Sequence, residues 1–371
     1  MSRGAIVVPV FILIALSILF FTHYFVYLSL THFFGIAAPA WRTALAVTLF
    51  LLPATFIASS ILAHRVDNVL SRTLYFCSSL WLGVGLTLLA ACVVAWAAWG
   101  ASRLVTHSPS PAWYGLAALV FTGIYSAYGI WNAYHPRVER ITVHLKNLPP
   151  AWRGKKVVQL SDVHLGRVLG TRFLDGLVEK VNAEDPAGVF ITGDLFDGTD
   201  GHLDELVSPL NNLNAPAFFI TGNHETFLGV ERAYAALHTT RVRILADEMV
   251  TVDGLQVIGI SYPTRGHPVN FAKLLAQLPG FDPALPSILL YHSPTHREEA
   301  KAAGISLQLA GHVHRGQIFP IQLFTRLIYG KYYYGLHVDG DYALYTTSGA
   351  GTWGATMRTG NHPEFVVIHL E

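Results

Sequence analysis

The sequence contains few cysteines, and their positions exclude two classes of structure. Among its 371 residues only Cys77 and Cys92 are cysteine, and both fall within one apolar run. A small domain held together by several disulfides needs more cysteines, and a thiolate zinc site needs them clustered with other ligands. The chain therefore has neither a disulfide framework nor a thiolate metal cage.

Charge is scarce as well. Only 13% of the residues are charged, and the formal net charge is +1. Because no basic field attracts nucleic acid, nucleic-acid binding is not indicated. The mean hydropathy of +0.39 is too high for an ordinary soluble protein, and the length allows two or more domains. We therefore expect a membrane part.

Charged residues are nearly absent before residue 137. Of the 25 basic and 24 acidic residues, only Arg3, Arg42, Arg65, Asp67, Arg72 and Arg103 precede it. Four runs without Lys, Arg, Asp or Glu reach the ~20 residues needed to cross a hydrocarbon core, near residues 5–30, 43–62, 74–99 and 113–134. The first is longer than the apolar region of a signal peptide, so we expect it to be retained. We predict a four-helix transmembrane region over residues 1–136 and a second domain over 137–371.

The arginines beside these runs predict an orientation. If all four runs cross, Arg3, Arg65, Arg72, Arg137 and Arg140 lie on one side, against Arg42 and Arg103 on the other. Cytoplasmic loops carry the excess of basic residues. We therefore expect an inner-membrane protein with both termini, and hence the second domain, in the cytoplasm.

The second domain alternates between strand and helix patterns. Strands separated by helices indicate a mainly parallel sheet, and Asp253-Gly254 between two short strands predicts an antiparallel hairpin. Helices are expected at about 171–183 and 203–213. Apolar runs predict strands at 141–145, 157–161, 188–192, 217–221, 250–252, 256–260, 287–291, 307–310, 342–347 and 365–370.

Side chains able to bind metal follow five of these strands. Each motif alone has an ordinary explanation, since Gly-Asp closes many turns and Asn-His can cap a helix. An ordered set of five at the carboxyl ends of strands, where open α/β sheets bind ligands, instead indicates a metal site. The motifs are Asp162-Val-His164, Gly193-Asp194-Leu-Phe-Asp197-Gly198, Gly222-Asn223-His224-Glu225, His292 and Gly311-His312-Val-His314.

This order of motifs resembles the calcineurin-like metallophosphoesterases. The segments Gly311–Pro320 and Thr347–Gly354 are similar to those of a membrane-associated bacterial branch of predicted phosphohydrolases. The resemblance covers the chain from about residue 155 onward and implies an α/β domain with a two-sheet β-sandwich flanked by helices. Arg315 departs from the pattern, because family members often carry a small residue beside the second histidine.

The resemblance also assigns roles to the motif residues. It implies two metal ions, with Asp162, His164 and His314 on the first, Asn223, His292 and His312 on the second, and Asp194 bridging both. The donor set itself, imidazole, carboxylate and amide without thiolate, suits Mn²⁺, Fe²⁺ or Zn²⁺. His224 would act on the substrate as a proton donor, oriented by Asp197. A turn cap before Gly198 is the alternative for Asp197.

These features predict a membrane-anchored hydrolase of phosphoester or pyrophosphate bonds that uses water as nucleophile. A lipid-linked substrate is the special case that we favour, and a soluble phosphodiester is the runner-up. The alternative class is a non-catalytic membrane protein whose domain binds metal or nucleotide to regulate a partner. A complete ligand set with a general acid disfavours that class, because a binding module needs no proton donor.

The segment Ile318–Leu336 carries apolar residues at helical spacing together with cations and tyrosines. Arg326, Lys331 and Tyr332–Tyr334 are groups that favour a membrane headgroup region. The segment either lies on a bilayer, with Phe324 and Leu327 facing lipid, or packs its apolar face on the sheet as an ordinary crossover helix. The two possibilities differ in whether these two side chains are exposed.

Overall fold

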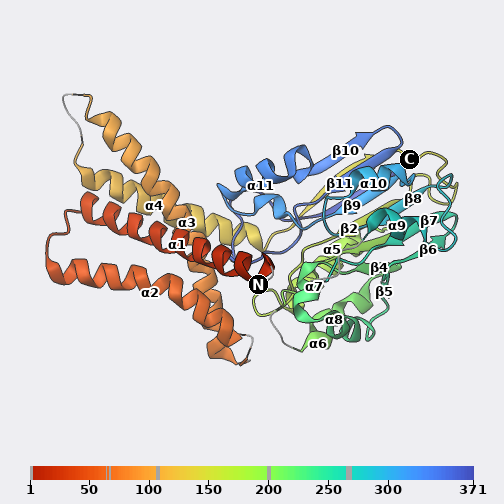
Figure 1. The fold of residues 1–371 in the computed structure, drawn as a ribbon, viewed down its shortest axis with the longest axis horizontal. Coiled ribbons are helices and arrows are strands. Elements are labelled where there is room, and N and C mark those ends of the chain that lie inside the picture. Colours follow the sequence, from red (N-terminus) through yellow and green to blue (C-terminus); the bar gives the residue numbers. More distant parts are fainter. Residues whose placement is uncertain (1–2, 64, 67, 106–108, 199–201, 265–269) are drawn as a thin grey trace. The chain divides into compact units, whose positions relative to one another are not determined.

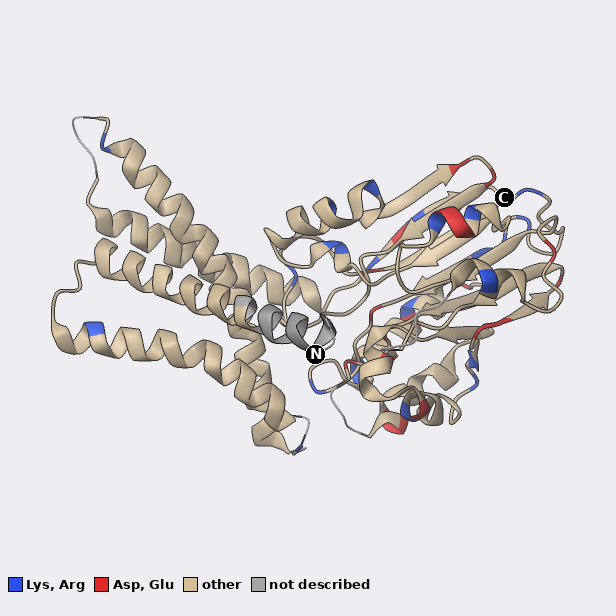
Figure 2. Ribbon diagram, viewed as in Figure 1, with Lys and Arg blue, Asp and Glu red and all other residues tan. Residues whose placement is uncertain are grey.

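The computed structural model describes residues 3–63, 65–66, 68–105, 109–198, 202–264 and 270–371. The chain forms two compact units (Figure 1). Unit 1 comprises Met1–Ile130 with Gly354–Met357, and unit 2 comprises Trp131–Trp353 with Arg358–Glu371. Figure 2 shows that charged residues are frequent in unit 2 and rare along the helices of unit 1, as the composition predicts.

Unit 1 is built from four helices, α1 (Arg3–Phe33), α2 (Pro39–Ala63), α3 (Val69–Ser102) and α4 (Pro111–Ala133). The first three contain stretches long and apolar enough to cross a membrane. Helix α4 has 23 residues, which suffice in length, but its tyrosine, tryptophan and asparagine residues make it less apolar. The prediction of four spans is therefore supported for three helices, and the fourth span stays a prediction.

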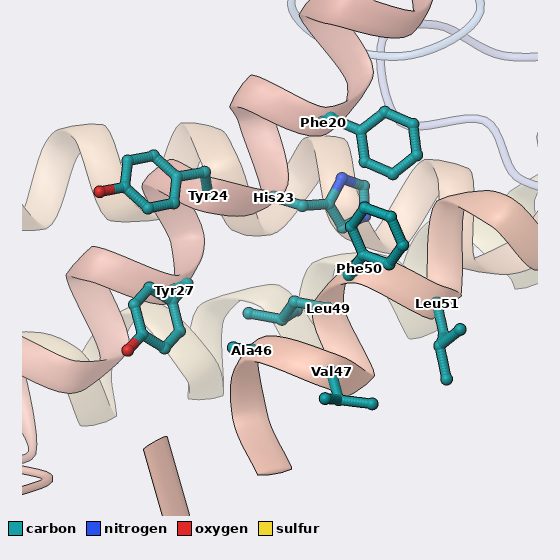
Figure 3. Close-up of a pocket in the computed structure, with 9 residues that line it drawn as sticks. All are labelled: Phe20, His23, Tyr24, Tyr27, Ala46, Val47, Leu49, Phe50 and Leu51. Carbon is teal, nitrogen blue, oxygen red and sulfur yellow. The ribbon is translucent and has the colours of Figure 1, made fainter. Parts of the chain in front are cut away.

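Helices α1 and α2 border an apolar groove of about 570 Å³ (Figure 3). His23 lies in this groove with both ring nitrogens engaged. Its Nδ1 lies 2.8 Å from the carbonyl oxygen of Leu19, and its Nε2 accepts a hydrogen bond of 3.0 Å from the indole N–H of Trp81 on α3. The histidine thus ties α1 to α3, and we assign it a structural role.

Unit 2 contains two six-stranded mixed sheets, so the expected two-sheet α/β architecture is confirmed. The first has the order β1-β12-β2-β3-β4-β5, and the second β10-β11-β9-β8-β7-β6. The predicted hairpin at Asp253-Gly254 joins β6 and β7, which pair antiparallel. The bounds are β1 Arg137–Val143, β2 Lys156–Leu160, β3 Gly188–Thr192, β4 Ala217–Ile220, β5 Arg243–Ile244, β6 Glu248–Val252, β7 Leu255–Gly259, β8 Ser287–Leu290, β9 Leu307–Ala310, β10 Gly335–Asp339, β11 Tyr342–Thr346 and β12 Glu364–Leu370.

The central strands of both sheets are buried on both faces, which explains why they are continuous apolar runs. In β2, Val158 and Leu160 belong to the core beneath the helices of the first sheet, whereas Val157 belongs to the core between the sheets. In β8, Leu289 faces a third core under the helices of the second sheet. Those helices are α5 Thr171–Ala183, α6 Leu203–Val207, α7 Asn223–Leu228 and α8 Val230–Leu237 on the first sheet's side, and α9 Phe271–Ala276 and α10 Arg297–Ala302 on the second's.

One predicted helix differs from the structure. The helix expected at 203–213 ends at Val207 and continues as a 3-10 turn, η1 (Ser208–Asn212). Pro209 lies at the start of that turn, and a proline inside an α-helix removes a backbone hydrogen bond and clashes with the preceding turn. Further along, the 3-10 turns η2 (His314–Gly316) and η3 (Gly330–Tyr333) flank α11 (Ile321–Tyr329).

Candidate metal centre

The predicted site residues follow the carboxyl ends of five strands that belong to both sheets. Strands β2, β3 and β4 are parallel neighbours in the first sheet, and β8 and β9 are parallel neighbours in the second. Parallel strands bring their carboxyl ends to one edge, so the five motifs meet where the two sheets adjoin. The groups brought together are Asp162, His164 and His314; His164, Asp194 and His224; and Asp194, His292 and His312.

The backbone of the motifs is held in an unfavourable conformation. Asp162, His164, Asp194, His312 and His314 all have positive φ angles, between 46° and 73°. This region is sparsely populated for residues other than glycine, and such conformations concentrate at functional sites. Space is also tight, because a Cβ at Gly222 would overlap the carboxylate of Asp194. The surrounding fold therefore fixes these side chains in place.

In one group of candidate ligands, three metal-ligating atoms have no hydrogen-bond partner. The Oδ1 of Asn223, Nε2 of His292 and Nδ1 of His312 are buried without a hydrogen-bond partner among the residues that the structure describes. Burying a polar atom in this way is costly unless a ligand satisfies it. The Nδ1 of His292 lies 2.8 Å from the carbonyl oxygen of Thr192, and by donating to it leaves a lone pair on Nε2. These residues fit a divalent ion.

The other group is more compact, and its nitrogens contact each other. The Nε2 atoms of His164 and His314 lie 2.9 Å apart, and Nε2 of His314 lies 3.4 Å from Oδ1 of Asp162. One of the two nitrogens must carry the shared hydrogen, which an ion at this position would displace. The same residue types are present, so this group also fits a divalent ion, but with less open space.

Asp194 lies between the two groups. Its Oδ2 is 3.1 Å from Nε2 of His292 and 3.9 Å from Nε2 of His164, and its Oδ1 accepts a hydrogen bond of 2.8 Å from the backbone N–H of His224. Without a metal ion the His292 contact is an ion pair when the imidazole is protonated. A carboxylate reached from both sides is placed as a bridging ligand would be.

Burial determines the charge state of most of these histidines. Loss of solvation lowers the pKa of His164 and His314 well below the usual value and lowers the pKa of His312 to about 4. Neutral imidazole is the form that binds metals. Burial also acts to lower the pKa of His292, but the negative charge of Asp194 outweighs it and raises that pKa. A metal ion would have to replace this proton.

His224 is buried at the same edge, and the main chain of Asp197 orients its ring. Its ring centroid lies 4.6 Å from that of His164. Its Nδ1 lies 2.8 Å from the backbone carbonyl oxygen of Asp197, whereas the sequence prediction assigned this contact to the carboxylate. Oδ1 of that carboxylate instead lies 3.9 Å from Nδ1 of His164. A carbonyl fixes the tautomer equally well, because it accepts the Nδ1 hydrogen.

Two buried charged residues organise the site and were assigned no role from the sequence. The carboxylate of Glu225 accepts hydrogen bonds from the backbone N–H groups of Asp194, Phe196 and Gly222, at 2.9, 3.1 and 2.6 Å. The guanidinium of Arg358 donates to the carbonyls of Ser348 and Gly351 and lies 3.1 Å from Nδ1 of His314. Glu225 could have been found as an acidic third residue of a helix, whose side chain accepts a hydrogen bond from the N-cap backbone N–H of Gly222. Arg358 lies in no motif.

Arg315, the departure from the family pattern, is directed to an aromatic ring. Its guanidinium carbon lies 3.9 Å from the ring centroid of Tyr334, in a cation–π contact. The residue has a φ of 47°, and the side chain of Asn361 donates a hydrogen bond to its carbonyl. The cation beside the site is thus held by Tyr334.

Comparison with known proteins identifies the family. Residues 155–316 match the family described as calcineurin-like phosphoesterase. A protein of Helicobacter pylori named as an uncharacterized metallophosphoesterase is 32% identical over 256 residues, which cover 66% of this chain and 68% of the relative. A Bos taurus protein named as a transmembrane protein with metallophosphoesterase domain is 33% identical over 278 residues, covering 68% of this chain and 62% of the relative.

A solved structure, a dimetal phosphatase from Danio rerio, has a TM-score of 0.38 and 11% sequence identity over 59% of this chain and 93% of that one. A likeness at this level supports no argument about the site. The sequence relatives extend beyond the matched part, because this chain spans about two thirds of their length. The residues that match the family include all five motifs of this chain, from Asp162 to His314. The chain therefore belongs to the calcineurin-like metallophosphoesterases, a family of hydrolases that act on phosphorylated substrates.

Proposed function

We propose that this protein is a membrane-anchored phosphohydrolase that uses two divalent metal ions to cleave a phosphoester or pyrophosphate bond with water. The observation that carries the proposal is the cluster of Asp194, His292 and His312, in which Nε2 of His292 and Nδ1 of His312 are buried without a hydrogen-bond partner among the described residues, as is Oδ1 of Asn223. A structural polar cluster would satisfy its own donors and acceptors. Buried metal-ligating atoms that have no hydrogen-bond partner are instead arranged to bind a ligand.

The ligand assignment divides the donors between the two sides of Asp194. Asp162, His164 and His314 would hold one ion, Asn223, His292 and His312 the other, and Asp194 both. Manganese, iron(II) or zinc suits this donor set. Bound as a pair, such ions activate water and neutralise the charge that develops on a phosphoryl group.

His224 would supply the proton for the leaving oxygen. With Nδ1 held by the Asp197 carbonyl, Nε2 is the nitrogen able to exchange a proton with substrate. Its backbone N–H donates to Asp194, so the imidazole is fixed relative to the metal ligands. In this proposal Asp197 positions His224 through its main chain.

The anchor and the substrate class are parts of the same proposal. Residues 1–136 would form the anchor in the inner membrane, and residues 137–371 the phosphohydrolase domain on the cytoplasmic side. A phosphorylated substrate carried by a lipid is the favoured case, because the enzyme would then share the bilayer with its substrate. A soluble phosphodiester is the second case.

A hydrolysis screen of the full chain tests the proposal. The detergent-solubilised protein, loaded with Mn²⁺ or Zn²⁺, is incubated with a phosphomonoester, a phosphodiester and a lipid pyrophosphate. We expect turnover of at least one class, loss of it in the Asn223→Ala variant, and no loss in Asn211→Ala, a matched change at a half-buried asparagine on η1. Metal binding without hydrolysis of any class would instead support a regulatory domain.

A further inference from the structure

Helix α11 (Ile321–Tyr329) exposes its apolar side and buries its polar side, which is the reverse of an ordinary surface helix. Its inner side carries Thr325, which is buried, and Gln322, which is partly buried. Its opposite side exposes Leu323 by 60%, Phe324 by 62%, Leu327 by 81% and Ile328 by 74%. The alternative of an ordinary crossover helix, with these apolar side chains packed on the sheet, is excluded. A contiguous exposed apolar surface of this kind marks a binding face.

The chemistry around this face matches a membrane headgroup region. The segment from His314 to Val338 contains no Asp or Glu, and Figure 2 shows α11 in tan and blue only. Arg326 and Lys331 are exposed beside the apolar side chains, and Lys331 Nζ lies 5.1 Å from the ring centroid of Tyr332. Cations and tyrosines flanking an apolar face are typical of helices that lie in the plane of an anionic bilayer.

The C-terminal end of α11 adjoins the metal centre. Helix α11 begins seven residues after His314, and the ring of Tyr329, its last residue, lies 6.5 Å from that of His312. A surface that contacts α11 is therefore close to the candidate ligands. A lipid in that surface would bring its phosphate group to the site while the lipid itself stays in the surface.

We propose that α11 docks on the lipid bilayer and that the metal centre acts on a phosphate carried by a membrane lipid. The second clause deepens the proposed function and rests on it, whereas the docking itself does not. Three helices of the same chain are long and apolar enough to cross a membrane, and as an anchor they would keep α11 near a bilayer. Four outward side chains on a nine-residue helix are few for a stable protein interface, which buries roughly 1,200 Å² or more, but suffice for insertion between headgroups.

Fluorescence quenching in nanodiscs tests the docking independently of catalysis. The full chain, with Cys77 and Cys92 replaced by Ala, receives a single Leu327→Cys substitution and an environment-sensitive label. Nanodiscs contain equal parts of phosphatidylcholine and phosphatidylglycerol, with or without lipid carrying a bromine quencher on its acyl chain. The matched control is Leu285→Cys, a half-exposed leucine before β8, at the opposite end of that strand from His292.

We expect strong quenching of the label at position 327 and little at position 285. Equal weak quenching at both positions would overturn the docking proposal. A label at 327 that is shielded from water yet not quenched by brominated lipid would show a protein partner or a second copy on α11, and would also overturn it. None of these results depends on hydrolysis, so they leave the proposed function untouched.

The substrate clause is tested by a ratio of activities. Turnover of a phospholipid in vesicles is divided by turnover of a soluble nitrophenyl diester for the wild type, for Phe324→Ser with Leu327→Ser, and for Leu285→Ser. We expect the ratio to fall on the order of tenfold in the double variant and to stay constant in the control. An unchanged ratio in a double variant whose label, now carried by Leu323→Cys on the same face, is no longer quenched by lipid would overturn the lipid-substrate clause.

Discussion

The histidines of this site share one chemistry and differ in the partner of each ring nitrogen. His292 has its Nδ1 against the Thr192 carbonyl and its Nε2 open toward Asp194. His224 has its Nδ1 against the Asp197 carbonyl and stands beside the ligands. Nε2 is the free nitrogen in both, so its surroundings set the role: in His292 it faces the Asp194 carboxylate and is suited to bind metal, and in His224 it is suited to transfer a proton.

Substitution of His224 separates the two roles. His224→Ala should keep its metal and lose ~10² to 10⁴ in turnover of substrates with poor leaving groups, because the leaving oxygen then lacks a proton donor. The loss should be smaller for nitrophenyl esters, whose leaving group needs no proton. Metal analysis and turnover of both substrates measure this.

The control for that experiment is His238→Ala, the same change at an exposed histidine after α8. It should alter neither metal content nor turnover. Equal losses for the two substrates in His224→Ala would contradict a role as general acid.

At the scale of elements, the strands and the residues at their ends could be predicted, and the contacts that fix them could not. The helix at Thr171–Ala183 and the strands at Gly188–Thr192 and Leu307–Ala310 have the predicted bounds. Apolar runs reveal such strands because both faces are buried. Strand β10 escaped prediction because Gly335–Asp339 is a partly exposed edge strand without a continuous apolar run.

The supporting residues of the site had no sequence signature for a related reason. Arg358 lies 44 residues from His314 along the chain, and only the fold brings the two together. The Asp197 carbonyl is a main-chain group, which residue type does not reveal. Long-range packing and backbone geometry thus supply what motif patterns omit.

Glu225 shows how one carboxylate can hold two strand ends together. Its three hydrogen bonds come from loops after β3 and β4. In Glu225→Gln one acceptor oxygen becomes an N–H₂ group facing a backbone N–H, so we expect the variant to lose about 1–3 kcal/mol of stability. Thermal unfolding of the purified protein measures this as a lower Tm.

Glu231→Gln, an exposed change in the first turn of α8, is the control and should leave the Tm unchanged. If Glu225→Gln unfolds at the wild-type temperature, the carboxylate does not hold the two loops.

For the whole molecule, the side of the membrane on which the domain lies depends on α4. Three helices are suited to cross, and three crossings would put the two termini on opposite sides. We predict that α4 is the fourth span, which with the arginine distribution places the domain in the cytoplasm. A reporter enzyme that is active only after export, fused to the C-terminus, should then be silent.

A strongly active reporter would show that α4 does not cross or that the arginine bias is overridden, and would place the phosphohydrolase domain outside the cytoplasm. Fusion of the same reporter after Ser102, before α4, is the control and should be active, because three crossings precede it. Together the two fusions show whether α4 crosses the membrane.

The central claim is a pair of metal ions joined by Asp194, and metal analysis of wild type and Asp194→Asn tests it most directly. Elemental analysis of the purified full chain should give two divalent ions per wild-type chain. The variant should retain roughly half or less and lose nearly all turnover, because one carboxylate holds both ions. Asp204→Asn, an exposed change on α6, should match the wild type. An Asp194→Asn protein with two bound ions and wild-type turnover would contradict the account.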